Sequence, residues 1–227
     1  MTAGTGSSML PSVQPHSQQP IKIQGPQAEP FPMQCNTARS DYVVAGPKLY
    51  MDPAWKQKRS LAADHKVAGL GVYCHFQEQG HDSDIFIQAT TTEVVSALQA
   101  EAEALVLAAK AVSVMCLQEP TFFSDCLALS RAAVTSSLTD CTVPWEVRKQ
   151  VLDFKNSSAH LLPNIFHISS DFNGVAHNCA QQAIRSSRSE PTFSCMNSAH
   201  RNSACQNLQA LSSLCMPGTV IHSVFCL

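Results

Sequence analysis

Segment 99–112 constrains the fold of this chain more than any other stretch. It consists almost entirely of Ala, Leu, Glu and Lys, which have the highest helix propensities. Apolar residues recur at spacings of three, four and seven and predict one buried stripe: Leu98, Leu105, Ala109, Val112 and Cys116. Glu101 and Glu103 fall in the first turns, where the helix dipole favours negative charge. Taken alone, the segment predicts a buried amphipathic helix that begins near residue 92 or 93 and ends near 116.

Strands are predicted on both sides of this helix. Segments 48–52, 67–76 and 84–90 are rich in strand-forming residues, and the first ends near Asp52 because Pro53 lacks a backbone N–H. The predicted elements that follow are a strand at 121–125, helices at 126–133 and 144–154, a strand at 164–169 and a helix at 173–184. This order predicts an α/β fold. We expect a mixed five-stranded sheet, with a three-strand antiparallel meander, two parallel strands and helices on its faces.

The composition divides the chain into three parts. Residues 1–44 are rich in Pro, Gln, Ser and Gly and are predicted to be a disordered leader. Residues 45–186 carry the predicted strands and helices and form the expected domain. Residues 187–227 return to Ser, Asn, Cys and Gln, which predicts a low-complexity, Cys/Ser-rich tail of unknown structure.

The ten cysteines are scattered and include no Cys-x-x-Cys pair. Several fall inside apolar patterns, so we expect free, partly buried thiols rather than disulfide bridges. A zinc site would need tighter spacing. On paper one can be assembled only from distant residues: His177, Cys179, Cys195, His200 and Cys205.

Charge and hydropathy exclude some classes of protein. The net charge of −2 provides no strong field toward nucleic acid or membrane. No apolar run approaches the length of a membrane span, and the N-terminus has no signal-peptide pattern. We therefore expect an intracellular protein, in either the nucleus or the cytoplasm.

Three acidic residues have comparable settings in the predicted elements. Asp52 lies on the first strand, Glu103 on the long helix, and Asp125 ends the fourth strand. If the first and fourth strands are neighbours, the helix can bring Glu103 onto the two aspartates. Three carboxylates this close repel one another unless a cation lies among them, and oxygen ligands suit Mg²⁺ or Mn²⁺.

Residues 48–186 resemble a type 1 ribonuclease H domain, in the form found in plant proteins related to non-LTR retrotransposons. The motifs that carry the resemblance are Tyr-Met-Asp-Pro-Ala-Trp-Lys at 50–56, Gly-Leu-Gly-Val at 69–72, Ala-Glu-Ala-Glu-Ala-Leu at 100–105, Phe-Ser-Asp-Cys-Leu at 123–127 and His-Ile-Ser-Ser-Asp-Phe-Asn-Gly-Val-Ala-His-Asn-Cys-Ala at 167–180. Each motif is weak alone, and together they are fairly specific.

The resemblance implies a set of site residues. The family's three core metal-binding acids fall on Asp52, Glu103 and Asp125, which would bind two Mg²⁺ or Mn²⁺ ions. Glu101 and Glu103 point about 200° apart on a helix, and the family pattern of Glu directly before Ala-Leu selects Glu103. The family's histidine for product release or proton transfer falls on His167. His177 replaces a fourth carboxylate, where it either contacts a metal ion or its bound water, or is an ordinary polar residue of the helix.

The resemblance implies an endonuclease that uses metal ions to hydrolyse the RNA strand of an RNA/DNA hybrid, with a hybrid or other nucleic acid as partner. The sequence leaves the oligomeric state open, and a monomer is the default expectation. Trp55 and Trp145 could stack on bases, although core positions are the simpler expectation. An alternative is a retroelement-derived nucleic-acid-binding module that has lost catalysis. His177, Pro53 and the weak positive field favour it. A third hypothesis is an unrelated α/β protein whose acids are ordinary surface residues.

Overall fold

The computed structural model describes residues 44–57, 66–78, 80–139, 143–186, 190–200 and 205–227. The leader expected at 1–44 therefore lies outside the described residues, apart from its last one. The strands are β1 (Lys48–Gln57), β2 (Lys66–Glu78), β3 (His81–Thr91), β4 (Thr121–Ser124), β5 (Asn164–His167), β6 (Thr192–Cys195) and β7 (Thr219–Cys226). The α-helices are α1 (Ala97–Val114), α2 (Leu127–Val134), α3 (Arg148–Ser158), α4 (Gly174–Arg185) and α5 (Gln206–Leu211). Short 3-10 helices are η1 (Trp145–Val147), η2 (Ala159–Leu161), η3 (Ser170–Phe172) and η4 (Ser198–His200).

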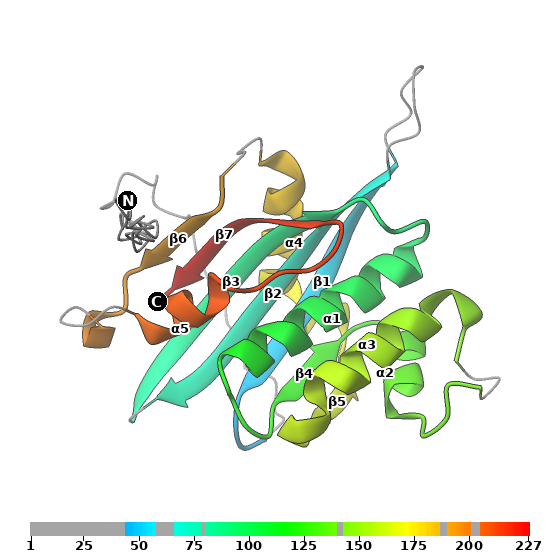
Figure 1. Ribbon diagram of the computed structural model, residues 1–227, viewed down its shortest axis with the longest axis horizontal. Coiled ribbons are helices and arrows are strands. Elements are labelled where there is room, and N and C mark those ends of the chain that lie inside the picture. Colours follow the sequence, from blue (N-terminus) through cyan, green and yellow to red (C-terminus); the bar gives the residue numbers. More distant parts are fainter. Residues whose placement is uncertain (1–43, 58–65, 79, 140–142, 187–189, 201–204) are drawn as a thin grey trace, which may run out of the picture.

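The described strands form one sheet in the order β5-β4-β1-β2-β3-β7-β6 (Figure 1). Strands β1, β2 and β3 form an antiparallel meander, while β4 is parallel to both β1 and β5. These five strands confirm the expected mixed α/β sheet. The expected strand number is wrong, because β7 pairs antiparallel with β3 and β6 pairs parallel with β7. Both added strands come from 187–227, where β7 reads Thr-Val-Ile-His-Ser-Val-Phe-Cys and is rich in β-formers.

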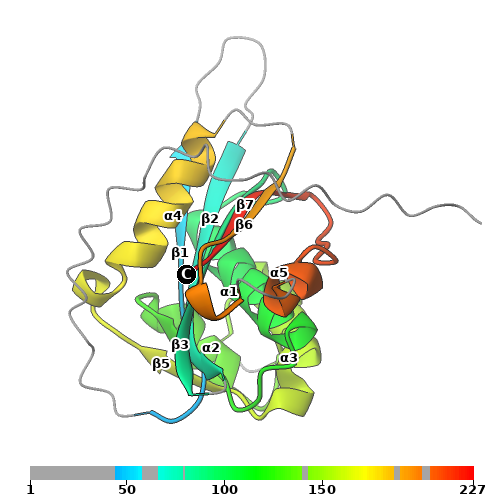
Figure 2. The same ribbon diagram turned by 90° about the vertical axis from the view of Figure 1, so that its left-hand side faces the viewer.

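Helices cover both faces of the sheet. Figure 2 shows α1, α3 and α5 on one face and α4 on the other. Side chains along each strand point alternately to the two faces of the sheet. Leu49 and Met51, two residues apart on β1, therefore both join the large core beneath α1. On the α4 face, Phe86 and Phe225 pack with Cys179 in a smaller cluster. Among the described residues, no helix is long and apolar enough to cross a membrane.

Strand β1 continues past Pro53, so the prediction that it ends near Asp52 is wrong. Pairing between β1 and β4 covers Lys48 to Tyr50 only, whereas pairing with β2 continues to Gln57. Beyond Tyr50, the described residues provide no strand partner for this edge of β1, and an open edge tolerates a residue without an N–H. The long helix also starts later than expected, at Ala97, where Ser96 accepts a hydrogen bond from the Gln99 N–H as its N-cap.

Two glycines let α4 lie directly on β2. A Cβ added at Gly69 would be 2.1 Å from the Ala180 carbonyl oxygen, and one at Gly71 would be 2.1 Å from that of Ala176. No other residue leaves room for this approach of helix backbone to strand. Because Gly71 is the register partner of Asp52, the close approach sets α4 beside the Asp52 carboxylate.

Candidate metal centre

Asp52 and Asp125 occupy equivalent places beyond the last residues paired between β1 and β4. That last pair is Tyr50 with Phe123, whose rings stack with centroids 4.9 Å apart. Each aspartate follows two residues later, so the alternation of a strand turns both carboxylates toward the same side. The expectation that the two strands are neighbours and bring these acids together is confirmed by this register.

Glu101 supplies the third carboxylate at this place. One ligand oxygen each from Asp52, Glu101 and Asp125 lies within 4.8 Å of the others. Burial, followed by the charges of Asp52 and Asp125, raises the pKa of Glu101 to about 8. Its Oε2 atom is buried and has no hydrogen-bond partner among the described residues. A buried, unpaired carboxylate oxygen beside two others fits a hard divalent cation such as Mg²⁺ or Mn²⁺.

Glu103 does not face this cluster, and the expectation that it joins Asp52 and Asp125 is wrong. Its Oε1 accepts a hydrogen bond of 3.0 Å from Nε2 of Gln150 on α3. Burial between the helices raises the pKa of Glu103, while the Gln150 hydrogen bond opposes the rise. Only one of the two glutamates faces the aspartates, as the helical spacing predicts. It is Glu101 rather than Glu103, because the rotation of α1 about its axis is set by packing against the sheet and α3.

Asn173 joins the two aspartates and was missed as a site residue. Its Nδ2 donates to the Met51 carbonyl oxygen at 2.9 Å and lies 3.4 Å from Asp52 Oδ1 and 3.3 Å from Asp125 Oδ1. The side chain is buried, and its own Oδ1 has no hydrogen-bond partner among the described residues. An Asn just before a helix usually indicates an N-cap. Here the side chain makes no capping hydrogen bond and instead points into the acidic cluster.

His177 contacts the carboxylate of Asp52. Its Nδ1 lies 2.8 Å from Asp52 Oδ2, and its Nε2 lies 2.8 Å from Nε2 of Gln181. An amide nitrogen only donates, so Nε2 of His177 accepts and the ring proton is on Nδ1, where it donates to Asp52. Burial raises the pKa of Asp52 to about 6, although the hydrogen bond from His177 lowers it and Asp125 raises it. Both ring nitrogens are thus engaged, which leaves His177 to orient Asp52.

His167 lies at the exposed rim of the cluster. It ends β5, and its Nε2 is 3.2 Å from the backbone carbonyl oxygen of Asp125. The structure therefore places four of the five predicted site residues at this end of the sheet: Asp52, Asp125, His167 and His177. Glu103 is the exception, and Glu101 and Asn173 are the additions.

No protein-family model matches this sequence, and no curated protein matches it. Similar solved structures include LC9-RNase H1, a type 1 RNase H with the type 2 active-site motif, at 10% identity and TM-score 0.48, covering 60% of this chain and 71% of that one. RNase H1 of Halobacterium salinarum NRC-1 is 16% identical with TM-score 0.44, covering 61% and 97%. LC11-RNase H1 from compost, in complex with an RNA/DNA hybrid, is 18% identical with TM-score 0.43, covering 61% and 96%. These likenesses are too weak to decide the activity of this chain, which depends on its own side chains.

Proposed function

We propose that this protein is a metal-dependent endonuclease that hydrolyses the RNA strand of RNA/DNA hybrids, with Asp52, Glu101 and Asp125 as its metal ligands. The observation that carries the proposal is the meeting of these three carboxylates around a buried Glu101 oxygen without a hydrogen-bond partner. Mg²⁺ or Mn²⁺ bound there, as one ion or two, would supply an activated water and stabilise the charge that develops on the phosphodiester.

The surrounding residues have positioning roles in this proposal. Asn173 holds Asp52 and Asp125 at a fixed separation, since one amide nitrogen lies within 3.4 Å of both carboxylates. His177 orients Asp52 from the α4 side through the 2.8 Å hydrogen bond. His167 is exposed and adjacent to Asp125, a place from which an imidazole can move a proton to or from a leaving group.

A nucleic-acid partner is supported by an exposed aromatic residue on the turn before α3. Trp145 is 80% exposed, contrary to the expectation of a core position. Its neighbour Glu146 accepts hydrogen bonds from Ser96 and Gln99, which fixes this turn against the start of α1. An exposed indole stacks on bases or sugars regardless of sequence. With a net charge of −2, attraction to phosphate depends on the bound cations.

The second candidate is a nucleic-acid-binding module without catalysis. The observation that favours it is His177, which stands where the resembled family has a fourth carboxylate and uses both ring nitrogens in hydrogen bonds. A site with three carboxylates binds divalent ions less tightly than one with four. In this case a hybrid would bind without being cut.

Cleavage of an end-labelled RNA/DNA hybrid with Mg²⁺ or Mn²⁺ tests the proposal. We expect cuts in the RNA strand alone, none in RNA or DNA duplexes of the same sequence, and loss of cleavage in Asp52→Asn and Glu101→Gln. Binding without cleavage at every divalent concentration would support the second candidate. Cleavage that persists in both variants would contradict the assigned site.

A further inference from the structure

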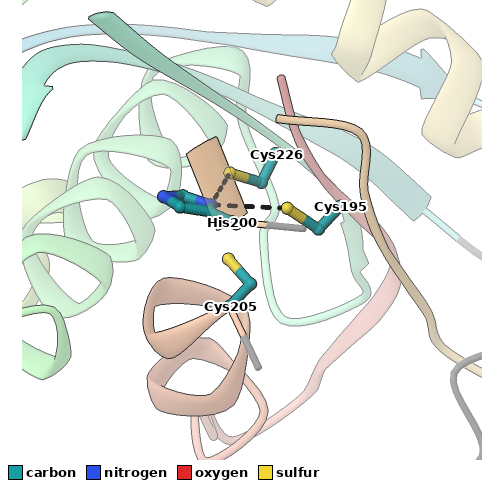
Figure 3. Close-up of side chains that lie close together, drawn as sticks. All are labelled: Cys195, His200, Cys205 and Cys226. Carbon is teal, nitrogen blue, oxygen red and sulfur yellow. Dashed lines mark hydrogen bonds between the residues drawn. The ribbon is translucent and has the colours of Figure 1, made fainter. Parts of the chain in front are cut away.

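Four potential metal ligands from the C-terminal segment meet at the edge of the sheet formed by β7 and β6. They are Cys195 at the end of β6, His200 at the end of η4, Cys205 just before α5 and Cys226 at the end of β7 (Figure 3). One ligand atom from each lies within 4.8 Å of all the others. The sequence had suggested a combination that included His177 and Cys179. Those two residues lie on α4, on the opposite face of the sheet, and Cys226 takes their place in the cluster.

The separations match those of a tetrahedral metal site. Nδ1 of His200 lies 3.4 Å from the Cys195 sulfur and 3.7 Å from the Cys226 sulfur. With Zn–S bonds of about 2.3 Å and Zn–N bonds of about 2.0 Å, the N–S edges of a tetrahedron are about 3.5 Å. In Figure 3 the Cys205 side chain points from the start of α5 toward the other three. A single ion at the centre is therefore within bonding reach of all four after small rotamer adjustments.

The fold itself brings the sulfurs together. Cys195 and Cys226 are register partners in the parallel pair of β6 and β7, so their side chains leave the same face of the sheet side by side. Cys226 is in turn paired with Ile85 on β3, which fixes it to the main sheet. Cys205 is buried at the start of α5, and this helix packs on the same face. Two paired strands and a helix thus present their thiols to one point.

The Glu78 carboxylate lies on the side of the His200 ring that faces away from the sulfurs. While Nδ1 of His200 faces the sulfurs, its Nε2 lies 3.7 Å from Oε2 of Glu78. That same oxygen accepts a hydrogen bond of 2.8 Å from Nδ2 of Asn207 on α5. A carboxylate near Nε2 favours the proton there and leaves the lone pair of Nδ1 free for a metal ion. In carboxylate–histidine–zinc arrangements the same two groups are joined by a hydrogen bond, which a small side-chain movement would form here from 3.7 Å.

We propose that Cys195, His200, Cys205 and Cys226 bind one Zn²⁺ ion in a closed structural site. Three thiolates and an imidazole select a soft or borderline cation over the Mg²⁺ or Mn²⁺ suited to the carboxylate cluster. With four protein ligands no coordination position remains for a substrate, so the site stabilises structure. It ties β6, α5 and β7 to the edge of the sheet. The described cysteines are free, as the sequence predicts, and three of them become neighbours here because β7 brings together residues that are distant in the chain.

The test is the metal content and Co²⁺ spectrum of the full chain purified under reducing conditions. We expect one Zn²⁺ per chain, and on replacement by Co²⁺ the absorption bands of tetrahedral thiolate coordination. Cys195→Ser removes a partly exposed ligand and is expected to abolish stoichiometric zinc. Cys116→Ser, which changes an exposed cysteine outside the cluster, is expected to retain it. Glu101→Gln is also expected to keep its zinc, which separates this site from the carboxylate cluster.

A second variant leaves all four metal ligands in place, so the protein does not have to fold with one of them missing. Glu78→Gln keeps all four ligands and removes only the carboxylate behind His200, so we expect Zn²⁺ affinity to fall about 10- to 100-fold in a chelator competition. Substoichiometric zinc in the wild type after reconstitution under reductant would overturn the proposal. A disulfide between any two of these cysteines in the reduced preparation would also overturn it, as would a Co²⁺ complex lacking thiolate bands.

Discussion

Glu101 and Glu103 lie two residues apart on α1, and their carboxylates serve different neighbours. Glu101 reaches the cluster of Asp52 and Asp125, whereas Glu103 accepts a hydrogen bond from Gln150 on α3. The helix turns about 200° over two residues, so one position necessarily faces the sheet end when the other faces α3. This pair provides a matched comparison of the same substitution at adjacent sites.

Glu101→Gln is expected to weaken Mn²⁺ binding at the carboxylate cluster by more than about 100-fold. Loss of a residue that only hydrogen-bonds to a metal ligand already costs about 10- to 100-fold, and Glu101 is itself a proposed ligand. Glu103→Gln is expected to leave Mn²⁺ affinity unchanged. It should also fold normally, since a glutamine amide can donate to the Gln150 Oε1, which has no partner among the described residues. Calorimetric titration of both variants measures the difference. Equal losses in both would contradict the placement of Glu101.

Stability without divalent ions is expected to fall as the pH rises from about 4 to about 8. The pKa of Asp52 is raised from 3.8 to about 6 and that of Glu101 from 4.5 to about 8, in both cases chiefly by burial. In this window the folded protein holds protons that the unfolded chain has released, so the free energy of unfolding decreases with pH. Mn²⁺ favours the ionised carboxylates and should reduce the decrease.

Urea unfolding at several pH values, with and without Mn²⁺, measures this effect. The groups that face the two acids are Asp125, Asn173 and His177, and all remain in Glu101→Gln, which serves as the control. The variant should lose the part of the pH dependence above about pH 6. A wild-type profile that rises across the same window would show that the carboxylates are not held protonated by the fold.

His177→Ala is expected to lower Mn²⁺ affinity by about 10- to 100-fold without abolishing folding, because the substitution removes the hydrogen bond that orients Asp52. The residue is exposed on α4, so little packing is lost. His160→Ala, at an exposed histidine of η2, is the matched control and should bind as the wild type does. Complete loss of binding in His177→Ala would instead indicate that the imidazole is itself a metal ligand.

Gly71→Ala is expected to destabilise the protein by about 1–3 kcal/mol or more, the usual cost of overpacking. The new Cβ would lie 2.1 Å from the Ala176 carbonyl oxygen and 2.5 Å from the Ala180 nitrogen, and helix backbone cannot rotate away as a side chain can. Displacement of α4 should also separate His177 from Asp52. Gly174→Ala is the control, because a Cβ there meets no atom within 4 Å. Thermal and urea unfolding of the two variants measures the contrast, and equal stabilities would refute the close packing.

Much of the fold could be predicted from local patterns. The order of strands and helices through residue 186 and the alternation of buried residues follow from propensity and periodicity, which act over a few neighbouring residues. Asp52 and Asp125 were recognisable because each lies on a predicted strand or at its end. Asn173 was not, since its position before α4 indicates a cap, and only the location of Met51 and the aspartates reveals its actual partners.

The C-terminal segment marks the limit of such prediction. Its composition indicates low complexity, yet β7 is a full strand because β3 offers an edge for it, and an edge exists only once the sheet has formed.

The sequence by itself determined the α/β order, the long helix and two of the three clustered acids, because these depend on short-range spacing. Tertiary structure decided that Glu101 rather than Glu103 meets the aspartates, that Gly71 admits α4 beside Asp52, and that Cys226 joins Cys195. Each of these depends on how one element is rotated or paired against another. The rotation and pairing of an element depend on which of its apolar faces is buried against its neighbours. The spacing of residues along a single element does not encode this.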